Sequence, residues 1–128
     1  MGMPTKPYPK SAPDESKVIT KATLRTAERL GIKNTVLAKI LGVSEPTISR
    51  MRQGRYKLDR GQKAFELGIL LVRLYRSLDG IVAGDDRVAA DWLKNNNTAL
   101  DGIPLHLIQS VSGLTNVIAY IDARRAVV

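Results

Sequence analysis

The segment 34–53, NTVLAKILGVSEPTISRMRQ, is the stretch that most constrains the fold of this chain. Two short helices can cross at a steep angle only if the residues between them are small, apolar or glycine at fixed positions. The segment has such residues at every one of these positions: Leu37, Ala38, Leu41, Gly42, Val43, Ile48 and Met51. The spacing predicts a helix-turn-helix, although a small helical hairpin with no role in DNA binding is the alternative.

Helical periodicity continues through the rest of the chain, and no stretch alternates polar and apolar residues as a strand would. We therefore predict an all-α fold, with an N-terminal helix-turn-helix module followed by a small helical C-terminal domain. Helices are expected at about 14–30, 34–41, 45–53, 60–78, 86–94, 104–113 and 114–125. The expected regions are a flexible arm at 1–13, the helix-turn-helix module at 14–60, a connecting helix and turn at 61–84, and a C-terminal domain with a tail at 85–128.

Local signals set several of these boundaries. Asp59 and Gln62 have the spacing of a capping box that opens the helix at about 60. Pro104 is expected at the first position of its helix, which Gly113 would end. Gly102 is expected to supply a turn with positive φ.

The charge of the chain is concentrated in its first half. Lys and Arg total 20 and Asp and Glu total 12, which gives a formal net charge of +8. Residues 1–60 contain 13 of the basic and 5 of the acidic residues, whereas residues 61–128 contain 7 of each. This asymmetry is typical of a nucleic-acid-binding half joined to a neutral half that binds protein.

Composition excludes several classes of function. The chain has no cysteine and one histidine, His106, so a disulfide framework, a thiol nucleophile and a multi-histidine metal site are excluded. The sequence has no apolar run long enough for a membrane span and no secretory signal at its start. Since paired acids, a phosphate-binding loop and a metal motif are also missing, we expect a cytoplasmic binding protein, not an enzyme, without metal or cofactor.

Residues 17–60 resemble the helix-turn-helix of Xre-type, phage-repressor-like regulators, through the string LAKILGVSEPTISRMRQG. In such a motif the second helix lies in the major groove with its N-terminal residues at base edges. Arg50 could donate two hydrogen bonds to guanine, and Glu45 could accept one from cytosine. Ser44 is expected to cap the helix and secondarily to contact a phosphate. The residues expected to bind DNA are Ser44, Glu45, Thr47, Ser49, Arg50, Arg52, Arg55 and Lys57, the last three through phosphates.

The second half has a resemblance of its own. Trp92-Leu93 followed by NTALDGIPLHLI at 97–108 resembles the C-terminal motif of MbcA/ParS/Xre-type antitoxins. The chain departs from that motif in lacking a glycine after its last helix. The resemblance implies a RES-domain toxin that consumes NAD as the partner, neutralised by the C-terminal domain, and repression of the antitoxin's own operon. A stand-alone repressor whose second half only dimerises or senses a ligand is the alternative. Trp92 is expected in the core or just below an interface.

The helix at about 60–78 has apolar residues on two faces. One stripe is Leu67, Leu71, Leu74 and Leu78, and the other is Phe65, Ile69, Val72 and Tyr75. A chain of 128 residues cannot easily bury both. We therefore expect a homodimer, in which one stripe packs on the chain's own core and the other on a second copy.

The end of the chain differs in composition from the helix before it. Leu114, Val117, Ile118 and Ile121 share a face that should dock the last helix on its domain, whereas DARRAVV beyond it has too few apolar residues for a core. If the partner handles NAD, its cleft must accept phosphates, and arginine forks pair with anionic groups. We expect a free tail to fill that cleft, an ordinary frayed terminus being the alternative. The residues expected to bind the toxin are Tyr120, Arg124, Arg125, Ala126, Val127 and Val128.

Overall fold

The computed structural model describes residues 13–127, and this part of the chain is helical with no strand. The helices are α1 (Pro13–Arg29), α2 (Asn34–Leu41), α3 (Glu45–Arg52), α4 (Lys63–Ile81), α5 (Asp86–Lys94), α6 (Pro104–Leu107) and α7 (Val111–Val127). The all-α prediction is confirmed. The flexible arm expected at 1–13 lies outside the described residues, except for Pro13, where α1 begins.

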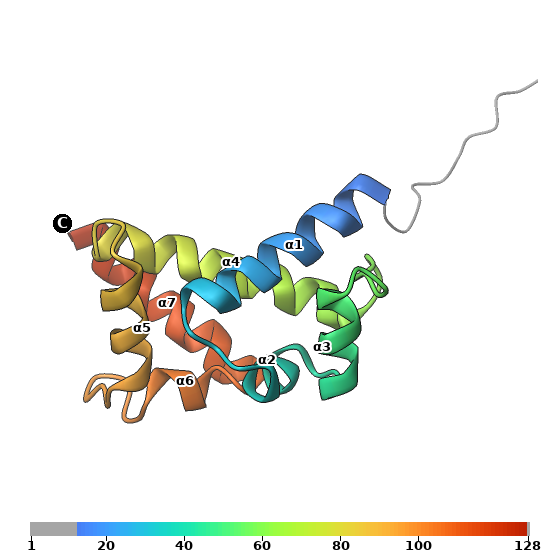
Figure 1. The fold of residues 1–128 in the computed structure, drawn as a ribbon. Helices are drawn as coiled ribbons and strands as arrows, with labels where there is room; N and C mark the ends of the chain where they lie inside the picture. Colours follow the sequence, from blue (N-terminus) through green and yellow to red (C-terminus); the bar gives the residue numbers. More distant parts are fainter. Residues whose placement is uncertain (1–12, 128) are drawn as a thin grey trace, which may run out of the picture.

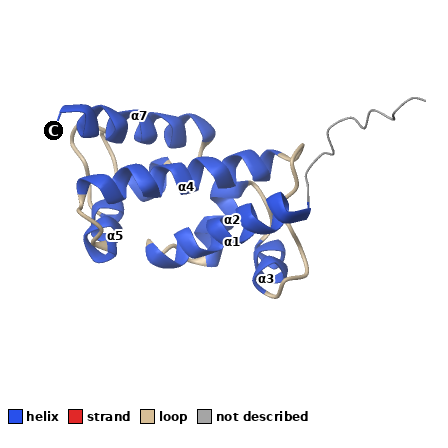
Figure 2. Ribbon diagram, turned by 90° about the horizontal axis from the view of Figure 1, so that it is seen from above, coloured by secondary structure: helices blue, strands red, loops and turns tan. Residues whose placement is uncertain are grey.

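Helix α4 is the centre of the structure, with α7 along one side and α1 along the other (Figure 2). The short helix α3 lies near the beginning of α4, and α5 lies near its end (Figure 1). The stripe of α4 that includes Leu71, Leu74 and Leu78 is completely buried. Both halves of the chain contribute to the hydrophobic core around this stripe, from Ala27 of α1 to Ile121 of α7.

Helix α4 begins at Lys63, three residues later than the capping signal predicted. The expected bond does form, because the Asp59 amide donates to the Gln62 side chain over 3.1 Å. The residue between them that prevents a helix is Gly61, whose φ of 99° belongs to the left-handed region. The Asp59–Gln62 pair therefore closes a turn, and the helix begins only after it.

The break before α7 also differs from the prediction. Gly113 does not end a helix but lies in the first turn of α7, and the break falls at 108–110. A Cβ on Gly113 would lie 1.8 Å from the carbonyl oxygen of Leu107, so glycine is required here because α6 packs closely on α7. The positive φ expected at Gly102 belongs instead to Asp101, at 57°.

None of the helices in the described range combines the length and the apolar character that a membrane span requires.

Candidate functional site

The crossing of α2 and α3 follows the predicted pattern. Leu37, Leu41 and Ile48 are completely buried, and Ala38 and Met51 nearly so. Gly42 ends α2 in the left-handed conformation, with φ of 71°, which lets the chain turn sharply into α3. The buried positions fix the orientation of α3, so its opposite face points to solvent.

The solvent face of α3 begins at its cap. The Ser44 hydroxyl accepts a hydrogen bond from the Thr47 amide over 3.2 Å and lies 2.8 Å from the Thr47 hydroxyl. The predicted capping role of Ser44 is confirmed. Beyond the cap, Glu45, Ser49 and Arg50 are exposed, and they line a shallow hollow of about 470 Å³.

Arg52 points away from this hollow. Its Nε donates to Asn34 over 2.8 Å, and its Nη1 lies 3.3 Å from the Glu28 carboxylate. These contacts tie α3 to α2 and α1. The structure thus gives Arg52 a second, structural role that the sequence pattern did not indicate.

The loop after α3 is fastened to α1 by several contacts, which include a hydrogen bond from Ser16 to Asp59 and an ion pair between Arg60 and Glu15. Leu58 is completely buried, and its amide donates to the Thr20 hydroxyl over 2.9 Å. This anchor places Arg55 and Lys57 on the surface beside α3, where both are exposed. Arg55 also lines the hollow formed by Glu45, Ser49 and Arg50, so a basic side chain from the loop extends that surface.

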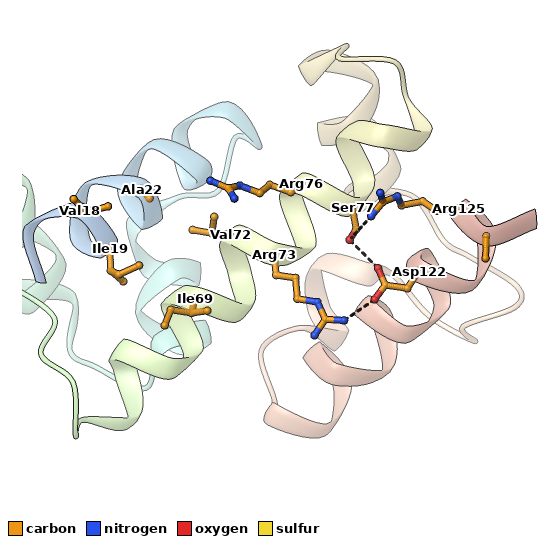
Figure 3. A pocket seen from close by; sticks show the side chains of 11 residues that line it. Val18, Ile19, Ala22, Ile69, Val72, Arg73, Arg76, Ser77, Asp122 and Arg125 are labelled. Atoms are coloured by element: carbon orange, nitrogen blue, oxygen red, sulfur yellow. Dashed lines mark hydrogen bonds and ion pairs between the residues drawn. The ribbon is translucent and has the colours of Figure 1, made fainter. Parts of the chain in front are cut away.

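The last helix docks as predicted, with Leu114, Val117, Ile118 and Ile121 buried. The expectation of a free tail from Asp122 is wrong for the described residues, because α7 continues to Val127. Asp122 accepts hydrogen bonds from the Ser77 hydroxyl (2.7 Å) and from Arg73 (2.8 Å), and Arg125 donates to Ser77 (3.3 Å) (Figure 3). The Ser77 hydrogen bond, assisted by Arg73, holds the pKa of Asp122 below its ordinary value.

The expected toxin-binding residues therefore lie on a helix. Tyr120 is half-buried, and Arg124, Arg125 and Ala126 are exposed. Val127 is the last residue of α7, but its side chain and the whole of Val128 lie outside the described part of the chain. Arg124 donates to the Tyr120 hydroxyl over 3.1 Å.

A groove of about 720 Å³ runs across α1, α4 and α7 (Figure 3). Its α1 side is apolar, with Val18, Ile19 and Ala22, and Ile69 and Val72 continue this surface on α4. Its other end is polar and is formed by Arg73, Arg76, Ser77, Asp122 and Arg125. The side chains of Val18 and Ile69 are 60% and 40% exposed, which is unusual for large apolar residues that lie together.

Part of the second apolar stripe predicted on α4 is not exposed in the structure. Phe65 is 4% exposed and packs inside the core, so it is not free for a second copy. The Tyr75 hydroxyl is not free for a second copy either. It accepts a hydrogen bond from Arg29 (3.2 Å) and donates one to Asp86 (2.7 Å). Burial raises the pKa of Tyr75. The hydrogen bond from Arg29 lowers this pKa, and the hydrogen bond to Asp86 raises it further. The exposed part of the second stripe is reduced to Ile69 and Val72.

Trp92 is expected from the sequence to lie in the core or just beneath an interface. In the structure Trp92 is half-buried and its ring stacks on that of Tyr120, with centroids 6.4 Å apart. The two residues are 28 positions apart on α5 and α7, so helical periodicity gave no signal of the pair. In the described residues, no group of three or more His, Cys, Asp or Glu side chains could hold a metal ion.

Two family matches cover most of the chain. Residues 11–73 match the antitoxin Xre-like helix-turn-helix domain. Residues 78–126 match the antitoxin Xre/MbcA/ParS C-terminal toxin-binding domain. A comparison with curated proteins gave no match. The matched ranges contain the exposed face of α3 and the α5–α7 region up to Ala126, and together they show that the chain belongs to the Xre/MbcA/ParS-type antitoxins.

Proposed function

We propose that this antitoxin neutralises a RES-domain toxin that degrades NAD, by covering the toxin's active site, and that it represses its own operon. The observation that carries the proposal is that one core supports both a helix-turn-helix domain and a toxin-binding domain. One molecule can therefore contact DNA and toxin through different faces. The assignment of a RES partner rests on the motif formed by Trp92-Leu93 and residues 97–108. This action would take place in the cytoplasm.

For DNA, we assign base reading to Glu45, Ser49 and Arg50 and phosphate contacts to Arg55 and Lys57. The first three are exposed on one face of α3, and the last two flank it on a loop that Leu58 anchors. Thr47 can also approach the major groove of the DNA, although its hydroxyl lies against Ser44. Arg52 keeps at most a partial phosphate role, because Asn34 and Glu28 already bind its guanidinium.

For dimerisation, we assign the second copy to the apolar part of the groove, which α1 and α4 form. Support comes from the exposed apolar residues Val18 and Ile69, which a monomer leaves in water. A two-fold dimer would also present two copies of α3 to two half-sites about one helical turn apart.

For neutralisation, we assign the end of α7 and the residues after it to the toxin's substrate site. Ala126 is exposed there, and the helix gives the chain end a fixed direction because Asp122 is bonded to α4. Ala126 and the two valines after it are small enough to enter a narrow substrate pocket and exclude the substrate.

The experiment that tests the proposal uses the product of a toxin-sized gene adjacent to this one. The two proteins are co-expressed and purified together, and NAD consumption by the toxin is measured with and without the antitoxin. Gel shifts with DNA from upstream of the operon test repression. Co-purification with loss of NAD consumption supports the proposal, whereas DNA binding with no partner and no inhibition would indicate a stand-alone repressor.

A further inference from the structure

The toxin-binding domain has an aromatic pair on its surface. Residues 78–126 contain two aromatic residues of the Phe, Trp and Tyr classes, Trp92 and Tyr120. Their rings stack at an interplanar angle of 18°. Each keeps part of its ring accessible while packing against the core with the rest. Trp and Tyr side chains that are apolar on one side and accessible on the other are enriched at protein interfaces, so this pair indicates a contact surface.

Arg124 completes this surface. Its guanidinium carbon lies 5.7 Å from the centre of the Tyr120 ring, within the range of a cation–π contact. Its Nη1 also donates to the Tyr120 hydroxyl. Trp, Tyr and Arg are the three residue types most enriched among the residues that dominate binding energy at protein interfaces. Here one of each lies in a single cluster.

The loop after α5 forms the edge of the cluster. Asn95, Asn96, Asn97, Thr98 and Ala99 line a hollow of about 340 Å³ together with Trp92 and Tyr120. Asn97 fixes the loop, since its amide donates to Gly102 over 2.8 Å and its side chain accepts from Leu100 over 3.1 Å. Asn95, Asn96 and Thr98 are exposed at the edge, where they can exchange hydrogen bonds with a partner.

The elements beneath the cluster are anchored in the hydrophobic core. Trp92 is next to Leu93, and Tyr120 is next to Ile121, both of which are completely buried. A partner would therefore meet a preformed surface and would lose little conformational entropy in ordering it. The face of α7 that is buried against α4 is not available to a partner, whereas Tyr120 and Arg124 lie on a part of α7 that stays accessible.

We propose that Trp92, Tyr120 and Arg124, edged by the 95–99 loop, are the docking site for the toxin protein, separate from the chain end that blocks the toxin's active site. This inference rests on the proposed antitoxin function. The complementary surface on the toxin would offer an apolar or aromatic side chain to Trp92, a carboxylate to Arg124 and polar groups to the asparagines. Docking supplies the affinity, and the end of α7 supplies the inhibition.

The test measures toxin binding by titration calorimetry with purified toxin and full-length antitoxin. Arg124→Glu reverses the charge, and Asn96→Arg places a large side chain at the edge; both positions are exposed, so folding should be preserved. Each change should weaken binding roughly tenfold or more. Trp92→Ala should do the same, with circular dichroism to check its fold. The matched control is Arg87→Glu, an exposed arginine of α5 outside the cluster, which should bind as the wild type does.

The outcomes are distinguishable. If wild-type antitoxin binds the toxin and the folded variants bind it equally well, the docking site is wrong while the antitoxin function stands. If the wild type does not bind the toxin, the proposed function and the docking site both fail. If Arg124→Glu changes sedimentation of the antitoxin without toxin, the cluster is an interface between copies of this chain, which overturns the proposal.

Discussion

The Ser77 hydroxyl donates a hydrogen bond of 2.7 Å to the carboxylate of Asp122, and this contact fastens the last turns of α7 to α4. Ser77 is buried, and Arg73 approaches the other carboxylate oxygen from the surface. The end of α7 therefore has a fixed direction relative to α4, on which the helix-turn-helix also packs through α1 and α2.

Asp122→Asn should reduce the free energy of unfolding at pH 7 by no more than about 1 kcal/mol, since solvent screens a carboxylate that is a third exposed. Because the folded state lowers the pKa of Asp122, the stabilisation is fully present above the ordinary carboxyl pKa and is lost as the pH falls through the lower folded value. Urea unfolding at pH 7 and near pH 2 measures the difference, which should disappear at the lower pH. Asp91→Asn, an exposed aspartate of α5, is the control. A difference of the same size at both pH values would contradict the role of ionised Asp122.

Gly113→Ala should destabilise the protein by about 1–3 kcal/mol, because the new Cβ would meet the Leu107 carbonyl and force α6 and α7 apart. Denaturant unfolding measures this decrease in stability. Gly80→Ala is the matched control, since there the added Cβ would meet only the side chain of Arg125, and alanine favours a helix. Equal free energies of unfolding for the two variants would show that α6 and α7 can move apart at Gly113 without a loss of stability.

These residues illustrate what the sequence could and could not predict. The crossing of α2 and α3 was predictable because its determinants, Ala38, Gly42 and Ile48, lie within one short segment. Gly113 was misread as a helix stop because the contact that requires glycine comes from another helix. The Asp122–Ser77 bond joins residues 45 positions apart, so the local composition suggested a free tail instead. The charge asymmetry and the motifs indicated the functional surfaces, whereas pairs such as Trp92 and Tyr120 depend on tertiary packing.

Arg50→Ala should weaken binding to operator DNA by about 1–3 kcal/mol and leave binding to random DNA less affected, because Arg50 is exposed on the face of α3 assigned to base edges. Gel-shift titrations at two salt concentrations measure both. Lys57→Ala is the comparison: it should weaken both DNAs alike and reduce the salt slope by about 0.9, the amount that one neutralised phosphate contributes. An equal weakening on operator and random DNA for Arg50→Ala would remove its base-reading role.

Ile69→Glu should raise the dissociation constant of the dimer roughly tenfold or more, since it places a charge in the apolar part of the groove. Sedimentation velocity over a range of concentrations measures it. Val88→Glu is the matched control, because Val88 is similarly exposed, at 46%, but lies on α5 away from the groove. A wild-type chain that stays monomeric at high micromolar concentration would refute the dimer.

Deletion of residues 126–128 should leave folding and DNA binding intact while restoring part or all of the toxin's activity. The cut follows Arg125 because Asp122 and Arg125 hold α7 to α4, and a deletion from residue 122 would remove this contact together with the blocking group. NAD consumption by the toxin is measured at saturating full-length or shortened antitoxin, with calorimetry to show that the shortened chain still binds. The matched control is deletion of residues 1–5 from the other end. If the shortened chain binds and inhibits as well as the full chain does, the last three residues do not block the active site, and inhibition must come from the surface formed by Trp92, Tyr120 and Arg124 itself.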